Sequence, residues 1–136
     1  MYKLVAIALV SLWSVSALAA DWQVVAETKL GQLRLDKGSL SKEGKYTKAV
    51  LVYEFKDLQS LTGPKHAVFN KRQDDILVDC STPSLGILSS NFFEDSRLSG
   101  SFSLKAEDVK FKPSAPDTMV ETVVNLVCTT KSNYGH

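Results

Sequence analysis

The chain has 136 residues, of which 44% are hydrophobic and 23% are charged, as is usual for one globular domain. Its 16 basic and 15 acidic residues give a formal net charge of +1. A chain this close to neutral lacks the basic excess on which binding to a phosphate backbone depends, so nucleic acid is not expected as a partner.

The first 20 residues have the three parts of a secretory signal peptide. Lys3 supplies the positive charge, residues 4–10 are apolar, and residues 17–19 form a small-x-small cleavage site. The mature protein is then residues 21–136, which we expect to form a single domain. No other apolar run approaches a membrane span, and no cysteine stands at the cleavage site to carry a lipid. The sequence therefore predicts an exported protein, periplasmic or secreted, that has no transmembrane segment and is not a lipoprotein.

Alternation of apolar and polar residues along the mature chain predicts a series of β-strands. They cover residues 21–28, 33–36, 46–56, 67–70, 76–80, 85–93 and 101–104. Trp22, Val24 and Ala26 share one face of the first strand, and Phe102 and Leu104 are expected to point inward from the last.

Two polar stretches are predicted to be turns. Residues 36–39 have turn chemistry, and the charged residues 71–75 are expected to join the strands on either side as an antiparallel hairpin. The paired acids Asp74-Asp75 and Glu94-Asp95 would then be solvated turn residues. Their use as general acid and base would require a cleft between two loops.

The hydrophobic period changes near the C-terminus. Residues 114–117 are typical of a helix start, with Ser114 as the N-cap. Two adjacent apolar rows follow, formed by Met119, Val123 and Val127 and by Val120, Val124 and Cys128. Because valine has only moderate helix propensity, a strand over residues 122–127 remains an alternative. Strands followed by one late helix predict an α+β fold, an antiparallel sheet with a helix packed on one face.

The chain has two cysteines, Cys80 and Cys128, separated by 47 residues. In an exported protein an even number of cysteines is expected to pair, so we predict a disulfide, with two separate buried thiols as the alternative. Closing a loop of that length restricts the unfolded chain by roughly 4 kcal/mol, which indicates a structural bond. A redox-active pair would usually need C-x-x-C spacing. If the helix forms, Cys128 is expected at its buried end.

Candidate catalytic residues are few. The only histidines are His66, near Gly63-Pro64, and His136, the last residue, and no G-x-S-x-G motif accompanies them. A small hydrolase built on His66 is therefore a minor hypothesis beside a solvated loop histidine, and we expect no enzyme. No clustered ligands indicate a metal site.

Two groups of residues are candidates for contact with a protein partner. Lys37, Lys42, Lys45 and Lys48 form the densest cluster of positive charge, although a solvated face between two strands would explain them as well. Phe92 and Phe93 must point to opposite faces of a strand, so one ring could be exposed to a partner or to a second copy of the chain.

Several landmarks along the mature chain together resemble the surface-adhesin protein E family. They are Trp22 near the start, the segment from Leu33 to Leu40, Asp79-Cys80, Phe111 before Pro113-Ser114, and Val127-Cys128. The resemblance covers nearly the whole mature chain. It implies an antiparallel sheet of six strands with a C-terminal α-helix tied to it by one disulfide.

The resemblance also implies a function. The best-known member of the family binds host matrix and serum proteins, can pair as a dimer and is reported to bind haem. His66 would be the candidate haem ligand here, although no motif supports it. We therefore predict an exported bacterial, non-enzymatic binding protein with a protein partner, no required cofactor and a homodimeric form to be tested. The alternative is a periplasmic housekeeping or stress protein on the same scaffold without adhesion, which the missing lipid-attachment cysteine favours.

Overall fold

The structure is a computed structural model that describes residues 20–61 and 68–130. Residues 1–19 of the predicted signal peptide, His66 and His136 lie outside the described residues. Within the described ranges, no helix has the length and apolar character needed to cross a membrane.

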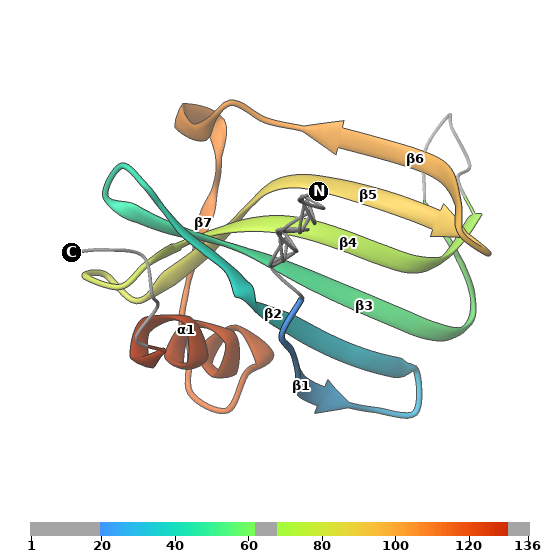
Figure 1. Cartoon of the computed structure of the whole chain (residues 1–136), viewed down its shortest axis with the longest axis horizontal. Coiled ribbons are helices and arrows are strands. Elements are labelled where there is room, and N and C mark those ends of the chain that lie inside the picture. Colours follow the sequence, from blue (N-terminus) through green and yellow to red (C-terminus); the bar gives the residue numbers. More distant parts are fainter. Residues whose placement is uncertain (1–19, 62–67, 131–136) are drawn as a thin grey trace, which may run out of the picture.

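The first six strands follow one another across a single antiparallel sheet, in the same order as along the chain (Figure 1). The order is β1 (Trp22–Glu27), β2 (Gly31–Glu43), β3 (Tyr46–Ser60), β4 (Val68–Asp79), β5 (Ser84–Glu94) and β6 (Arg97–Ser103). A short 3-10 helix, η1 (Ala106–Asp108), leads to β7 (Phe111–Pro113), which pairs with one end of β5. The predicted antiparallel sheet is confirmed, with β7 as a seventh strand.

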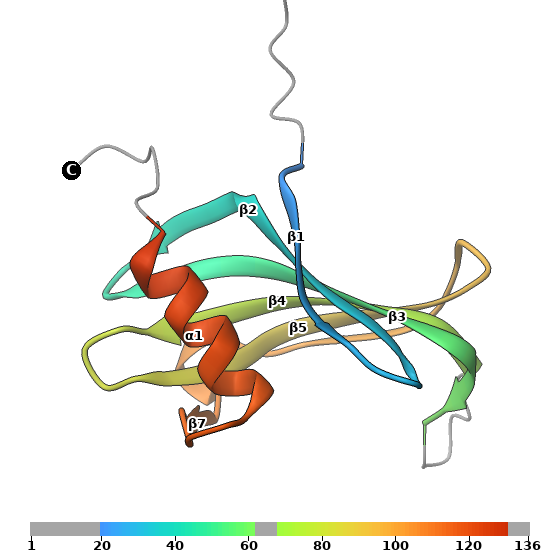
Figure 2. The same cartoon turned by 90° about the horizontal axis from the view of Figure 1, so that it is seen from below.

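One α-helix, α1 (Met119–Thr129), packs on one face of the sheet near one end of the long strands (Figure 2). Its buried residues Val123, Val124 and Val127 join a core that includes Leu35 and Ile76 from the sheet. We call this side of the sheet the helix face. The helix is therefore confirmed over the alternative of a strand, because its valines fall on one stripe that meets the core.

The helix begins later than predicted. Its N-cap is Thr118, whose Oγ1 accepts a hydrogen bond from the N–H of Glu121 at 3.2 Å. Asp117 has a φ of 60°, a left-handed conformation that cannot lie inside an α-helix. Ser114 is therefore wrong as the N-cap, and residues 114–117 form the turn before the helix.

Two predicted turns lie inside strands. Residues 71–75 are the middle of β4, and residues 36–39 belong to β2, where the pairing with β3 is interrupted between Asp36 and Ser41. At that interruption the Ser39 hydroxyl accepts the N–H of Val50 at 2.9 Å in place of a backbone carbonyl. Side-chain hydrogen bonds of this kind let a strand continue through sequence that is typical of turns.

The predicted disulfide between Cys80 and Cys128 is confirmed, with a Cα–Cα distance of 5.7 Å. It joins the turn between β4 and β5 to the last turn of α1. The expectation that Cys128 lies at a buried end of the helix is wrong, since both cysteines are exposed. Val127 is the last buried residue of the helix, so the bond lies at the border of the core.

Apolar residues in or next to the two edge strands, β1 and β6, are more exposed than predicted. Trp22 and Val24 are 41% and 49% exposed, because a register shift between Val24 and Ala26 turns the later residues of β1 to the core instead. Phe102 and Leu104 were expected to point inward, but they are 44% and 42% exposed. The helix packs mainly against β1, β2, β4 and β5, and it leaves Phe102 and Leu104 uncovered.

Candidate functional site

An open apolar cleft of about 340 Å³ lies on the helix face, between the sheet and the first half of α1. Its wall is formed by Met119, Val120 and Val123, and its floor includes Leu51 and Ile87. A cleft of this size, lined mainly by apolar side chains with a few polar groups, is typical of a binding site. We call it the cleft.

The register of the strands places the side chains that line the cleft. Tyr53 in β3 is directly opposite Leu33 in β2 and Arg72 in β4, and alternate residues of a strand share a face. Leu51, Tyr53 and Phe55 therefore all point to the helix face. The helix covers the part of this face at Leu51 but leaves the part beyond Tyr53 open.

Starting in the lining of the cleft, five aromatic rings cross four strands of the helix face. Successive ring centroids are 4.2, 5.7, 4.8 and 6.4 Å apart. The rings belong, in order, to Tyr53, Phe55, Phe69, Phe92 and Phe102. We call this set the aromatic row. It starts at the cleft and ends at the half-exposed ring of Phe102 on β6.

A polar cluster of Arg72, Asp74 and Ser90 lies beside the cleft. Asp74 Oδ1 accepts hydrogen bonds from Arg72 Nε at 2.8 Å and from Ser90 Oγ at 2.5 Å. The guanidinium carbon of Arg72 is also 5.5 Å from the ring centroid of Phe92, directly across the strand pair. Because each charge has a partner, the cluster offers a fixed polar edge to an otherwise apolar site.

The sequence predicts a turn at residues 71–75, with Asp74 as a solvated acid, and therefore does not reveal this cluster. Asp74 has a side chain that is only 14% exposed. The signal that could have found it is the period of two that places Arg72 and Asp74 on the same face as Ile76 and Val78. Four charged residues in five obscured that alternation.

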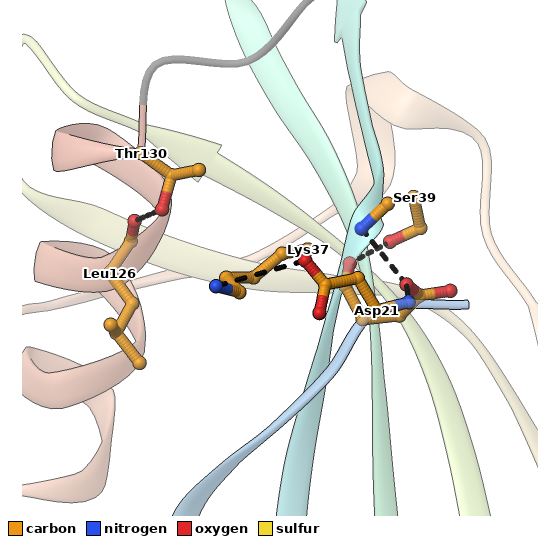
Figure 3. A network of polar contacts seen from close by, with 7 residues as sticks. Asp21, Lys37, Ser39, Leu126 and Thr130 are labelled. Carbon is orange, nitrogen blue, oxygen red and sulfur yellow. Dashed lines mark hydrogen bonds and ion pairs between the residues drawn. The ribbon is translucent and has the colours of Figure 1, made fainter. Parts of the chain in front are cut away.

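The four predicted lysines do not form one surface. The Nζ of Lys37 is 3.8 Å from Oδ2 of Asp21, and the two residues face each other in Figure 3. Lys45 lies in the turn between β2 and β3. Lys42 and Lys48 occupy adjacent pairs of that hairpin, so they point to opposite faces. Their role in partner binding remains a prediction.

Phe92 and Phe93 point to opposite faces of β5, as strand geometry requires. Phe92 is 2% exposed and forms part of the aromatic row. Phe93 lies half-buried on the other face, where Lys71 Nζ is 5.5 Å from its ring centroid. Contact of either ring with a partner also remains a prediction.

In the described part of the chain, no group of three or more His, Cys, Asp and Glu side chains is arranged to hold a metal ion. The predicted haem candidate, His66, lies outside that part.

Comparison with known proteins gives one family and several solved structures. The model of the family described as surface-adhesin protein E matches residues 22–129. A structure of Haemophilus influenzae protein E aligns with a TM-score of 0.54 at 14% identity, covering 77% of this chain and 83% of that one. Protein E from non-typeable Haemophilus influenzae aligns with a TM-score of 0.52 at 12% identity, covering 77% and 74%. At these identities the alignments show a common fold. Comparison with the curated proteins gave no match.

Proposed function

The chain belongs to the surface-adhesin protein E family, and from that premise we propose that it is an exported, non-enzymatic binding protein that recognises another protein through the cleft and the aromatic row. The single observation that carries this proposal is the uncovered end of the helix face, where an apolar cleft continues into a row of aromatic rings.

The exposure of large apolar side chains around this surface supports a protein partner. Met119, Phe102 and Leu104 are 46%, 44% and 42% exposed. Apolar and aromatic side chains beside a concave site are the usual anchors of protein interfaces, where they contribute most of the binding free energy. The cleft would receive an apolar side chain of the partner, and the aromatic row would be covered around it.

The polar cluster supports binding rather than catalysis. Both hydrogen bonds to Asp74 Oδ1 come from neighbours fixed on the same sheet. A carboxylate held in this way fixes the positions of the Arg72 guanidinium and the Ser90 hydroxyl at the edge of the cleft. We assign the cluster the role of orienting a partner group at the edge of the cleft.

Family membership supports host matrix or serum proteins as the partners. The test is binding of these proteins to immobilised residues 21–136, with the variant Met119→Asp. An acid in the first turn of a helix is favourable, so this variant is expected to keep the fold while placing a charge at the mouth of the cleft. We expect at least tenfold weaker binding.

The matched control is Leu30→Asp, since Leu30 is 63% exposed in the turn between β1 and β2 and does not line the cleft. It is expected to bind as the native protein does. Equal affinities for Met119→Asp, Leu30→Asp and the native protein would overturn the cleft as the contact surface.

The alternative, a periplasmic protein on the same scaffold without adhesion, is separated by location. An adhesin must be reached by antibody or by added protease on intact cells. Complete protection in intact cells, with exposure only after the outer membrane is opened, would favour the periplasmic alternative.

A further inference from the structure

The strand β6 forms one edge of the sheet. It pairs with β5 on one side, and no strand of the described residues pairs with it on the other. A register shift between Phe92 and Phe93 leaves Ser99 opposite no residue of β5, but pairing is regular from Gly100 onward. The N–H of Leu104 continues the ladder by donating to the carbonyl oxygen of Leu88 at 2.8 Å.

This hydrogen bond fixes the direction of the neighbouring main-chain groups. The N–H groups of an antiparallel edge strand point alternately toward its partner and away from it. Because the N–H of Leu104 points to β5, the N–H and carbonyl groups of Ser101 and Ser103 point away from the sheet. They form a short row of donors and acceptors without a strand to pair with.

The edge has few of the features that natural sheets use to prevent strand pairing. No charged residue and no proline lies between Arg97 and Lys105. The opposite edge, β1, has six residues with a register shift at Val24 and ends in Glu27. Charges, bulges and shortness blunt an edge, and they protect β1. The same features protect the start of β6, which is seven residues long, begins with Arg97 and has its register shift at Ser99. The regular part of β6, from Gly100 to Ser103, has neither a charge nor a bulge and is open.

The side chains of β6 indicate what kind of strand would fit beside it. Phe102 is paired with Ser90 and points to the helix face, whereas Ser101 and Ser103 point to the opposite face, and all three are exposed. Cross-strand neighbours on one face pack together. A strand added at β6 would therefore place apolar residues next to Phe102 and Leu104 and small polar residues next to the serines.

We propose that the free edge of β6 binds an extended segment of the protein partner by strand addition, and that this segment alternates apolar and small polar residues. The proposal rests on the proposed function, because the occupant is a segment of the protein that contacts the cleft. It adds the mode of recognition: main-chain hydrogen bonds to Ser101 and Ser103 provide affinity, and Phe102 extends the aromatic row to the added strand.

The probe is a blocked nine-residue peptide, Lys-Thr-Val-Thr-Phe-Thr-Val-Thr-Lys, added to ¹⁵N-labelled residues 21–136. We expect the amides of Ser101 and Ser103 to exchange with solvent at least tenfold more slowly when the peptide is bound. Two N-methylated peptides carry the methyl groups on alternate residues. One of them should lose binding and the other should keep it, because only one set of N–H groups faces β6.

A protein variant tests the same edge. Ser103→Pro removes an N–H that points away from the sheet, so it costs no hydrogen bond to β5, and Ser103→Thr keeps that N–H. The peptide should bind Ser103→Thr normally and Ser103→Pro at least tenfold more weakly. If Ser103→Pro does not fold, the N-methylated peptides still decide the question.

Three outcomes would overturn strand addition. The first is equal binding of both N-methylated peptides. The second is protection of Ser101 and Ser103 that appears without peptide and disappears on dilution, which would identify a second copy of the chain as the occupant. The third is a matrix or serum protein that loses affinity with Met119→Asp but binds Ser103→Pro normally. In that third case the proposed function stands and the proposed mode of recognition fails.

Discussion

Arg72 and Asp74 lie two residues apart on β4, and both point to the helix face, where Nε and Oδ1 are 2.8 Å apart. We predict that Asp74→Leu lowers the free energy of unfolding by about 2 kcal/mol. The reason is that it leaves a half-buried guanidinium and the Ser90 hydroxyl without their acceptor. Urea denaturation followed by circular dichroism measures the change.

The double variant Arg72→Leu/Asp74→Leu provides the control. An ion pair replaced by two apolar side chains is often no less stable than the pair itself, so the double variant should be more stable than Asp74→Leu alone. Additive losses from the two single variants would show that Arg72 and Asp74 do not act as a pair.

The disulfide between Cys80 and Cys128 should contribute about 4 kcal/mol, because it closes a loop of about 50 residues in the unfolded chain. We therefore expect Cys80→Ser/Cys128→Ser to lower the urea midpoint strongly and to speed hydrogen exchange in the last turns of α1. A loss below about 1 kcal/mol would mean that apolar packing of the helix, and not the bond, holds it to the sheet.

Much of the fold could be predicted because each element has a clear period or a covalent constraint. Ala49 and Leu51 occupy alternate positions of β3 on one face, whereas Lys48 and Glu54 lie on the other face, and Val123 and Val127 are four residues apart in α1. Export and two cysteines predicted the disulfide. The periods are local signals, because they can be found within one segment of the sequence. They are strong because each of these segments buries one face in the core.

The cleft could not be predicted in the same way, because it depends on which end of the sheet the helix leaves uncovered. Phe102 and Leu104 have the pattern of inward-facing residues, and they do point to the helix face. Their exposure follows from the position of α1, which the sequence of β6 does not encode. The helix start was misplaced for a local reason, since Ser114 and Thr118 can both serve as N-caps.

Gly86 in β5 lies under the segment that leads from η1 to β7. A Cβ placed on Gly86 would overlap Cγ1 of Val109 and lie 3.2 Å from the carbonyl oxygen of Lys110. We predict that Gly86→Ala costs about 1–3 kcal/mol through overpacking. Urea denaturation of Gly86→Ala, Val109→Ala and the double variant checks this, and the double variant should lose less than the sum. Strict additivity would contradict the contact.

Asp79 closes the turn between β4 and β5, next to Cys80. Its Oδ1 accepts the hydroxyl of Ser81 at 2.6 Å and the N–H groups of Ser81 and Thr82 at 3.0 and 3.2 Å. Hydrogen bonds to the ionised form, above all that from the Ser81 side chain, hold the pKa of Asp79 below its ordinary value of 3.8.

A depressed carboxyl pKa stabilises the fold only while the carboxyl is ionised. The contribution of Asp79 is therefore complete above its unfolded-state pKa of about 4, and it is lost as the pH falls through the lower folded-state pKa. We predict that Ser81→Ala raises the pKa of Asp79 toward 3.8 and flattens the dependence of stability on pH in this acid range. Titration of the Asp79 carboxyl carbon by NMR measures the shift. An unchanged midpoint in Ser81→Ala would mean that the two backbone N–H groups alone stabilise the carboxylate.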